Sequence, residues 1–135
     1  MESLNSAHVI GTLRNIHILL IDDEEYMVNL WKKIIERHGY HVSSYTNGLE
    51  ALKDFQSNPN IYDIIITDQS MPKINGLKLA EEILAVRKDI KIILCTGYLG
   101  DIEYQVKDHV YDILLKPFNS NTLIEAIQRN LADRI

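Results

Sequence analysis

The chain has 135 residues, of which 46% are hydrophobic and 24% are charged, and its formal net charge at pH 7 is −5. This length and composition are typical of one soluble globular domain whose core is large enough to fold without disulfides. The negative charge argues against nucleic acid as a direct partner, and two small basic clusters, within 32–37 and 87–91, are interpreted as solvated surface. No apolar run approaches the roughly 20 residues that would span a bilayer, which argues against a membrane protein.

The N-terminus and the cysteine content indicate the cellular compartment. The segment that begins at Met1 has neither the basic start nor the apolar stretch of a secretory signal peptide. The single cysteine, Cys95, cannot form an internal disulfide and is typical of a reducing environment. We therefore expect a cytoplasmic protein in which residues 1–14 form a frayed N-terminal leader and residues 15–135 form the folded domain.

Five short apolar runs predict five β-strands. The first and third runs are rich in β-branched residues and almost wholly apolar, which is the pattern of strands buried on both faces of a parallel sheet. In chain order, the predicted strands are 16–21, 41–45, 63–67, 91–95 and 111–115.

Apolar residues at helical spacing fill the intervals between these strands. The first helix carries an apolar stripe from Met27 to Ile35 and ends at Gly39. A second helix opens at Asn47, because Glu50 follows three residues later in a capping-box signature.

The later intervals are less uniform. A third helix begins near Gly76, and the last helix is expected to be capped by Ser120 or Asn121. Between the fourth and fifth strands, the stretch 101–108 has only a weak apolar stripe. We expect a short or poorly ordered fourth helix there.

The alternation of strands and helices predicts the fold class. Strands that alternate with helices through short loops pair in parallel through right-handed crossovers. Five such units predict an α/β fold: a flavodoxin-like, doubly wound, five-stranded parallel sheet of strand order 2-1-3-4-5, with helices on both faces.

Three carboxylates lie where two of these strands end. Asp22 and Asp23 close the first strand, and Asp68 closes the third. The carboxyl edge of a parallel sheet is where open α/β folds bind their ligands. Because converging carboxylates repel one another unless a positive charge lies between them, this arrangement predicts a site for a divalent cation.

Two further polar groups lie at predicted strand ends. Thr96 follows the fourth strand, and Lys116, with Pro117 next, follows the fifth. With the three aspartates, and with Met71-Pro72 and Asn75-Gly76 after the third strand, they appear in the order that is characteristic of one family. From about Ile16 to Leu131 the chain resembles the receiver domain of two-component response regulators, the CheY-like family.

The resemblance implies a phosphorylation site. Asp68 would be the nucleophile that takes a phosphoryl group and becomes an acyl phosphate. The metal would be Mg²⁺ or Mn²⁺, bound directly by Asp23 and Asp68, through water by Asp22, and by the backbone carbonyl of Ser70. Hard oxygen ligands of this kind are the ones that Mg²⁺ prefers.

The resemblance also assigns the remaining residues and the partners. Lys116 and Thr96 would bind phosphoryl oxygens, and the peptide bond before Pro117 would be cis. The donor would be a sensor histidine kinase or a histidine phosphotransfer protein. The recipient would be a downstream protein effector or an attached output domain. Such a domain acts as an enzyme only on its own phosphorylation and dephosphorylation.

The chain departs from the family pattern near the switch. The strand-five position three residues before Lys116 usually holds an aromatic residue, and here it is Ile113. The usual coupling between the threonine and that aromatic is therefore in doubt, and Tyr98 or Tyr111 could substitute for it. Ser70 and Tyr98 occupy positions that tune the lifetime of the acyl phosphate in this family.

Two other classes of function are open at this point. A pseudo-receiver, which binds partners without being phosphorylated, is favoured only by Ile113. An aspartyl-phosphate phosphatase of the haloacid dehalogenase type needs two aspartates separated by one residue, whereas Asp22 and Asp23 are adjacent. No phosphate-binding glycine-rich loop is present.

Overall fold

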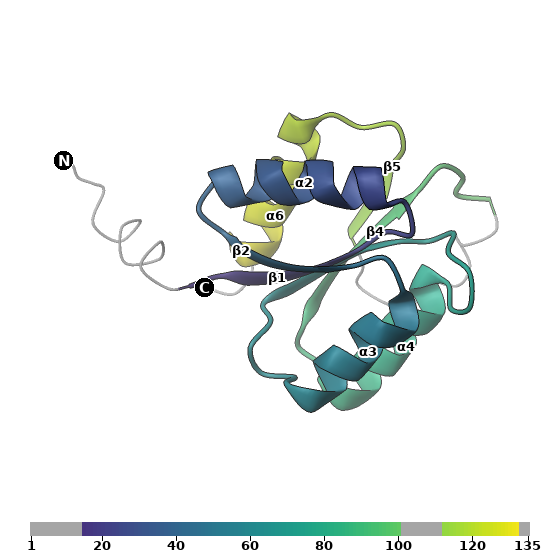
Figure 1. Ribbon diagram of the computed structural model, residues 1–135. Helices are drawn as coiled ribbons and strands as arrows, with labels where there is room; N and C mark the ends of the chain where they lie inside the picture. Colours follow the sequence, from purple (N-terminus) through teal and green to yellow (C-terminus); the bar gives the residue numbers. More distant parts are fainter. Residues whose placement is uncertain (1–14, 101–111, 133–135) are drawn as a thin grey trace.

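The computed structural model describes residues 15–100 and 112–132 (Figure 1). All five predicted strands are present, each within one residue of the predicted ends. The expected leader, the expected fourth helix and Tyr111 lie outside the described residues. In chain order the elements are β1 (His17–Ile21), α2 (Glu25–Arg37), β2 (His41–Tyr45), α3 (Gly48–Ser57), β3 (Ile64–Asp68), α4 (Gly76–Val86), β4 (Lys91–Thr96), β5 (Asp112–Leu115) and α6 (Ser120–Ala132).

The five strands form one parallel sheet in the order β2-β1-β3-β4-β5, which confirms the predicted α/β topology. Strands β1 and β3 are hydrogen-bonded neighbours near the centre, with Ile21 beside Thr67. The winding direction reverses between these two strands, so their carboxyl ends open onto the crevice where such folds bind ligands.

Helices cover both faces of the sheet (Figure 1). On one side, α2 and α6 pack over residues such as Ile18, Leu20 and Ile66. On the other side, α3 and α4 pack over residues such as Leu19 and Ile65. Each central strand therefore buries both of its faces, which explains why its sequence is apolar without alternation.

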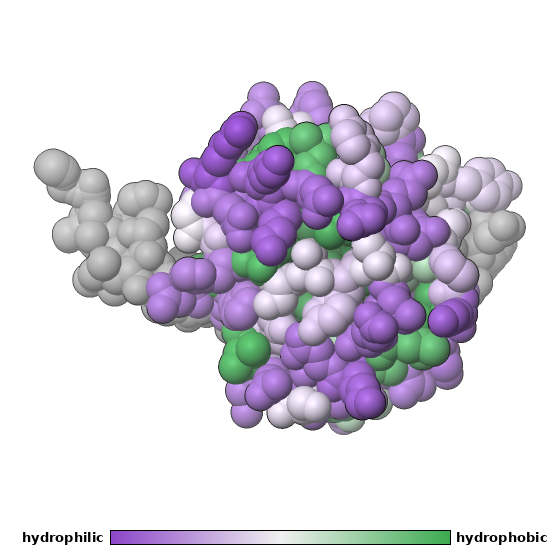
Figure 2. All heavy atoms as spheres, in the orientation of Figure 1, coloured by the Kyte–Doolittle hydropathy of each residue, from purple (hydrophilic) through white to green (hydrophobic). Residues whose placement is uncertain are grey.

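The outer surface is mostly polar. The side that carries α2 and α3 is covered largely by hydrophilic side chains, and apolar side chains show only as small separated patches (Figure 2). Within the part of the chain that the structure describes, no helix has the length and apolar character to cross a membrane.

The helix caps correct one prediction. The Asn47 side chain accepts hydrogen bonds from the backbone N–H groups of Leu49 and Glu50, as a cap of α3 should. The cap of α6, however, is Asn119, whose Oδ1 accepts from the N–H of Thr122 at 2.9 Å. The prediction of Ser120 or Asn121 was wrong because the helix begins one residue earlier, at Ser120, and both residues lie in its first turn.

Candidate functional site

The three acidic residues converge at the carboxyl edge of the sheet. One ligand oxygen from each of Asp22, Asp23 and Asp68 can be chosen so that all three lie within 4.8 Å of one another. Asp22 and Asp68 are each only 6% exposed, whereas Asp23 is exposed. The parallel pairing of β1 with β3 causes this meeting, because it aligns the ends of the two strands.

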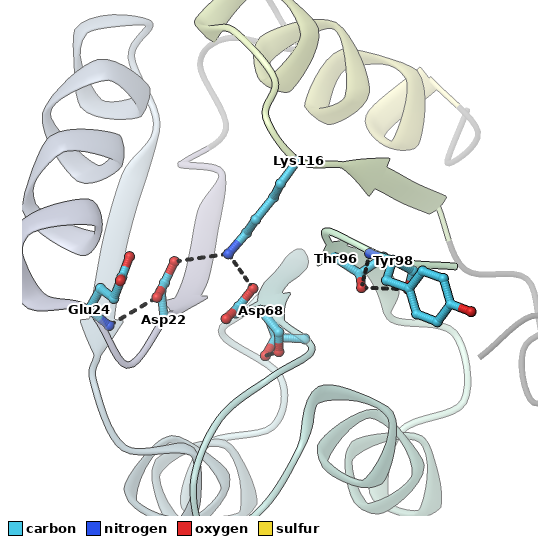
Figure 3. A network of polar contacts seen from close by, with 7 residues as sticks. Asp22, Glu24, Asp68, Thr96, Tyr98 and Lys116 are labelled. Carbon is cyan, nitrogen blue, oxygen red and sulfur yellow. Dashed lines mark hydrogen bonds and ion pairs between the residues drawn. The ribbon is translucent and has the colours of Figure 1, made fainter. Parts of the chain in front are cut away.

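Backbone contacts hold Asp22 in place. The N–H of Glu24, just before α2, donates to Oδ1 of Asp22 at 3.0 Å (Figure 3). The N–H of Asp22 itself donates to the carbonyl of Tyr45 at the end of β2, at 3.2 Å. The loop between β1 and α2 is thereby fixed to the neighbouring strand, with the Asp22 carboxylate turned into the site.

A glycine gives the backbone of Asp68 its position. A β-carbon on Gly76, the first residue of α4, would lie 2.5 Å from the Asp68 carbonyl oxygen and 3.0 Å from the Gln69 α-carbon. Such contacts are closer than side-chain atoms tolerate. The N–H of Gly76 also donates to the Gln69 carbonyl at 3.0 Å. The start of α4 therefore packs directly on the end of β3, which only glycine allows.

Lys116 reaches the carboxylates from the end of β5. Its Nζ lies 2.5 Å from Oδ1 of Asp68 and 3.9 Å from Oδ2 of Asp22 (Figure 3). Its backbone N–H donates to the carbonyl of Thr96 at 2.8 Å, so the lysine is anchored to β4. The peptide bond between Lys116 and Pro117 is cis.

The electrostatics leave the site short of positive charge. Burial raises the pKa of Asp68 although the hydrogen bond and charge of Lys116 oppose the shift. Burial also raises the pKa of Asp22, and the neighbouring negative charge of Asp68 adds to it. Burial alone would lower the pKa of Lys116, but the hydrogen bond to Asp68 and the charges of both aspartates raise it. One ammonium cannot balance three carboxylates, so the ionised site favours an additional cation.

The donor atoms fit a hard divalent ion. Three carboxylates from two adjacent strands supply oxygen ligands, the chemistry that Mg²⁺ and Mn²⁺ prefer over the nitrogen and sulfur ligands of zinc. Ser70, whose carbonyl is a further predicted ligand, is an exposed residue two positions after Asp68. The residues present are therefore compatible with the predicted metal.

Thr96 lies near the site, but its hydroxyl is engaged elsewhere. The residue is buried at the end of β4. Its Oγ1 donates to the carbonyl of Tyr98 at 3.0 Å and accepts from the N–H of Tyr98 at 3.2 Å (Figure 3). The Tyr98 residue is 66% exposed, so its ring does not fill the inward position that an aromatic usually takes.

Ile113 belongs to an apolar cluster beside β4. It is half-buried and packs with the partly buried Leu99 against Leu77 and Leu94. Among the described residues, this apolar cluster consists of aliphatic side chains. An aliphatic side chain can move in this cluster, but it has no hydroxyl to exchange hydrogen bonds.

The sequence alone did not reveal two aromatic neighbours of the site. Trp31, which lies on the apolar stripe of the first helix, is half-buried against the core and stacks on Phe118, with ring centroids 5.2 Å apart. Both rings line the same cavity as Asp68 and Lys116. The position of Phe118 directly after Lys116-Pro117 was the one available signal.

Comparison with known proteins places this chain in a family. The family model described as "Response regulator receiver domain" matches residues 18–128. The chain is 35% identical to the C4-dicarboxylate transport transcriptional regulatory protein DctD of Rhizobium meliloti. The match covers 83% of this chain but only 24% of DctD. It is 32% identical to the response regulator receiver protein CpdR of Brucella abortus, covering 84% of this chain and 95% of CpdR.

A solved structure agrees with these relatives. The response regulator TrrA of Thermotoga maritima, in complex with Mg²⁺-BeF, is 36% identical, with a TM-score of 0.75 and coverage of 85% of this chain and 98% of TrrA. The sheet order, the three converging aspartates and the matched family model lead to one conclusion. This chain belongs to the response regulator receiver domain family.

Proposed function

We propose that this receiver domain accepts a phosphoryl group on Asp68 from a phosphohistidine of a sensor histidine kinase or a histidine phosphotransfer protein. A carboxylate oxygen of Asp68 attacks phosphorus, and the bond between phosphorus and the imidazole nitrogen breaks. The nitrogen leaves with the bonding electron pair, and because the other ring nitrogen of the phosphohistidine carries a proton, the products are an aspartyl phosphate and a neutral imidazole. The contact between Asp68 and Lys116 at a carboxylate-rich sheet edge is the observation that carries this proposal.

Each neighbouring residue has a part in this reaction. Lys116, which now contacts Oδ1 of Asp68, would shift its ammonium to a phosphoryl oxygen as that oxygen takes up negative charge. Thr96 would exchange its bonds to the Tyr98 backbone for a bond to a second phosphoryl oxygen. Asp22, Asp23 and the Ser70 carbonyl would hold the metal together with Asp68.

The metal would be Mg²⁺ or Mn²⁺, and it would neutralise phosphoryl oxygens during the transfer. The three carboxylates that converge here support this assignment. The structure of TrrA in complex with Mg²⁺-BeF supports it by analogy. We place the protein in the cytoplasm, where its single, buried cysteine stays reduced.

The output would be a change of interaction surface. Phosphorylation would shift an existing equilibrium between two shapes, to which a downstream effector or an attached output domain responds. Ile113 would make this domain's coupling different from that of relatives with an aromatic there, since it packs in a cluster whose described members are all aliphatic. Ser70 and the exposed Tyr98 would tune the lifetime of the acyl phosphate by controlling how water approaches it.

Intact-mass measurement after incubation with acetyl phosphate tests the proposal. We expect one adduct of about 80 Da, the mass of a phosphoryl group, that requires Mg²⁺ and is absent from Asp68→Asn. An adduct that forms equally in Asp68→Asn would contradict the assignment of the nucleophile.

A folded protein that gains no adduct would favour the pseudo-receiver, for which Ile113 is the one supporting feature. Very fast loss of phosphate could mimic that result. Binding of beryllofluoride in the presence of Mg²⁺ separates the two cases, because a domain that hydrolyses its acyl phosphate rapidly still binds this analogue. Turnover of a phosphate ester would instead indicate a phosphatase.

A further inference from the structure

The rings of Trp31 and Phe118 stack across the space between α2 and the segment that follows β5. Their centroids are 5.2 Å apart and their planes differ by 22°. Both side chains are half-buried and pack against the core between the sheet, α2 and α6. Trp31 is the only tryptophan of the chain.

Each ring belongs to a segment that also carries a charged group of the site. Phe118 comes two residues after Lys116 and directly before Asn119, the residue that caps α6. Trp31 lies in α2, which begins directly after the acidic loop, where Asp22 accepts from the N–H of Glu24. The stack therefore joins the side of the site that carries the lysine to the side that carries the acidic pair.

The same two rings line a small cavity together with the residues of the ion pair. The polar part of its wall comes from Asp22, Asp68 and Lys116, and the remainder consists of the two rings, aliphatic core residues and Cys95. An ammonium is not stabilised by an apolar wall, so Lys116 directs its Nζ toward the carboxylates. A smaller residue in place of Phe118 would widen this cavity and free the segment that holds Lys116.

We propose that the Trp31–Phe118 stack sets the position of Lys116 relative to Asp22 and Asp68, which makes Phe118 a positioning residue for phosphoryl transfer. This inference rests on the proposed function. Aromatic pairs prefer a defined offset geometry, so they constrain a segment more tightly than an aliphatic contact does. Transfer depends on close alignment of the charged groups, and a misplacement of about 1 Å can slow a reaction on the order of a hundredfold.

The test compares rates of adduct formation with acetyl phosphate at saturating Mg²⁺. We expect Phe118→Leu to slow the reaction about tenfold, within the range that misplacement can cause. Phe118→Tyr, which keeps the ring, should restore the rate to within about twofold. Trp31→Leu should slow the reaction as Phe118→Leu does, and Trp31→Phe should restore it, so the effect is tested from both sides of the stack.

A matched control separates positioning from stability. Leu131→Ala removes a partly buried side chain that packs against the same core but lies in the last turn of α6, outside the segment that holds Lys116. We expect it to lower stability and to leave the rate unchanged. If Phe118→Leu reacts at the wild-type rate, or no more slowly than Leu131→Ala, the inference is overturned and the proposed function stands. If the wild-type protein forms no adduct and does not bind beryllofluoride with Mg²⁺, the proposed function fails and the inference fails with it.

Discussion

Lys116 and Asp68 form an ion pair that is largely withdrawn from solvent. The Nζ and Oδ1 atoms are 2.5 Å apart, and the side chains are 35% and 8% exposed. The lysine pairs with the carboxylate that, in the proposed function, would both bind a metal and attack phosphorus. The ammonium is therefore a counter-ion of Asp68 in this structure, and it would compete with the proposed metal for that carboxylate.

Removal of this ammonium should strengthen metal binding. We expect Lys116→Met to bind Mg²⁺ about fivefold more tightly, on the order of 1 kcal/mol, because one positive charge no longer opposes the ion. Titration calorimetry at pH 8 and low salt measures the change. Lys116→Arg keeps the charge and should resemble the wild type. Weaker binding in Lys116→Met would show that the lysine organises the carboxylates for the metal instead of competing with it.

The contact between Gly76 and the end of β3 predicts a strict requirement for glycine. The nearest atoms to an added β-carbon include the backbone of Asp68 and Gln69, which cannot rotate away. We expect Gly76→Ala to lower the free energy of unfolding by about 1–3 kcal/mol and to slow phosphorylation, since Asp68 must shift. Urea denaturation and adduct formation measure both effects. A β-carbon on Gly97 would meet nothing within 4 Å, so equal effects of Gly97→Ala would contradict this explanation.

The lowered pKa of His17 predicts that the folded protein loses stability at acid pH. Burial lowers the pKa of His17 below its ordinary value of 6.5, and the charge of His41 adds to this, while Asp63 and Asp54 oppose it. The unfolded chain therefore binds a proton on this residue more readily than the folded chain. Its contribution to stability is complete above pH 6.5 and is lost as the pH falls from there toward the lower folded-state pKa.

Urea denaturation between pH 7.5 and 5 measures this loss. The Nε2 atom of His17 lies 2.8 Å from the Ser43 hydroxyl, and an amide can make a similar contact. We expect His17→Gln to lose less stability than the wild type over the same pH range. Equal losses would show that His17 is not the source of the acid sensitivity.

The contacts of Arg87 predict that it stabilises the fold, although its basic cluster was first interpreted as solvated surface. That interpretation was wrong, because its side chain is only 14% exposed. Its Nη1 donates to the carbonyls of Pro59 and Tyr62, at 3.0 and 2.5 Å. We expect Arg87→Ala to cost about 2–4 kcal/mol of unfolding free energy, since both carbonyls lose a charged donor. Thermal or urea unfolding measures this loss.

A neighbouring residue provides the control for Arg87. Lys88 is exposed, and we expect Lys88→Ala to change stability by no more than about 0.5 kcal/mol. A loss in Arg87→Ala as small as that in Lys88→Ala would show that water replaces the guanidinium at these carbonyls.

Much of the fold could be predicted because it depends on local patterns. The central strands are buried on both faces, so their apolar runs are continuous and their ends are marked by the polar residues that follow. Asn47 was identified as a cap because its helix has one clear candidate. Asn119, Ser120 and Asn121 are three consecutive candidates, and only the backbone path after Pro117 selects the first of them.

The sequence by itself determined which chemical groups lie at the carboxyl ends of the strands. Local patterns are enough for this, because they show both the residue types and where along the chain each strand ends. Only the tertiary structure decided how those groups pair. The bond of Thr96 to the Tyr98 backbone and the stacking of Trp31 on Phe118 depend on side-chain rotamers and on contacts between segments. Such contacts are chosen by the packing of the whole core, to which residues far apart in the chain contribute, and no local pattern specifies them.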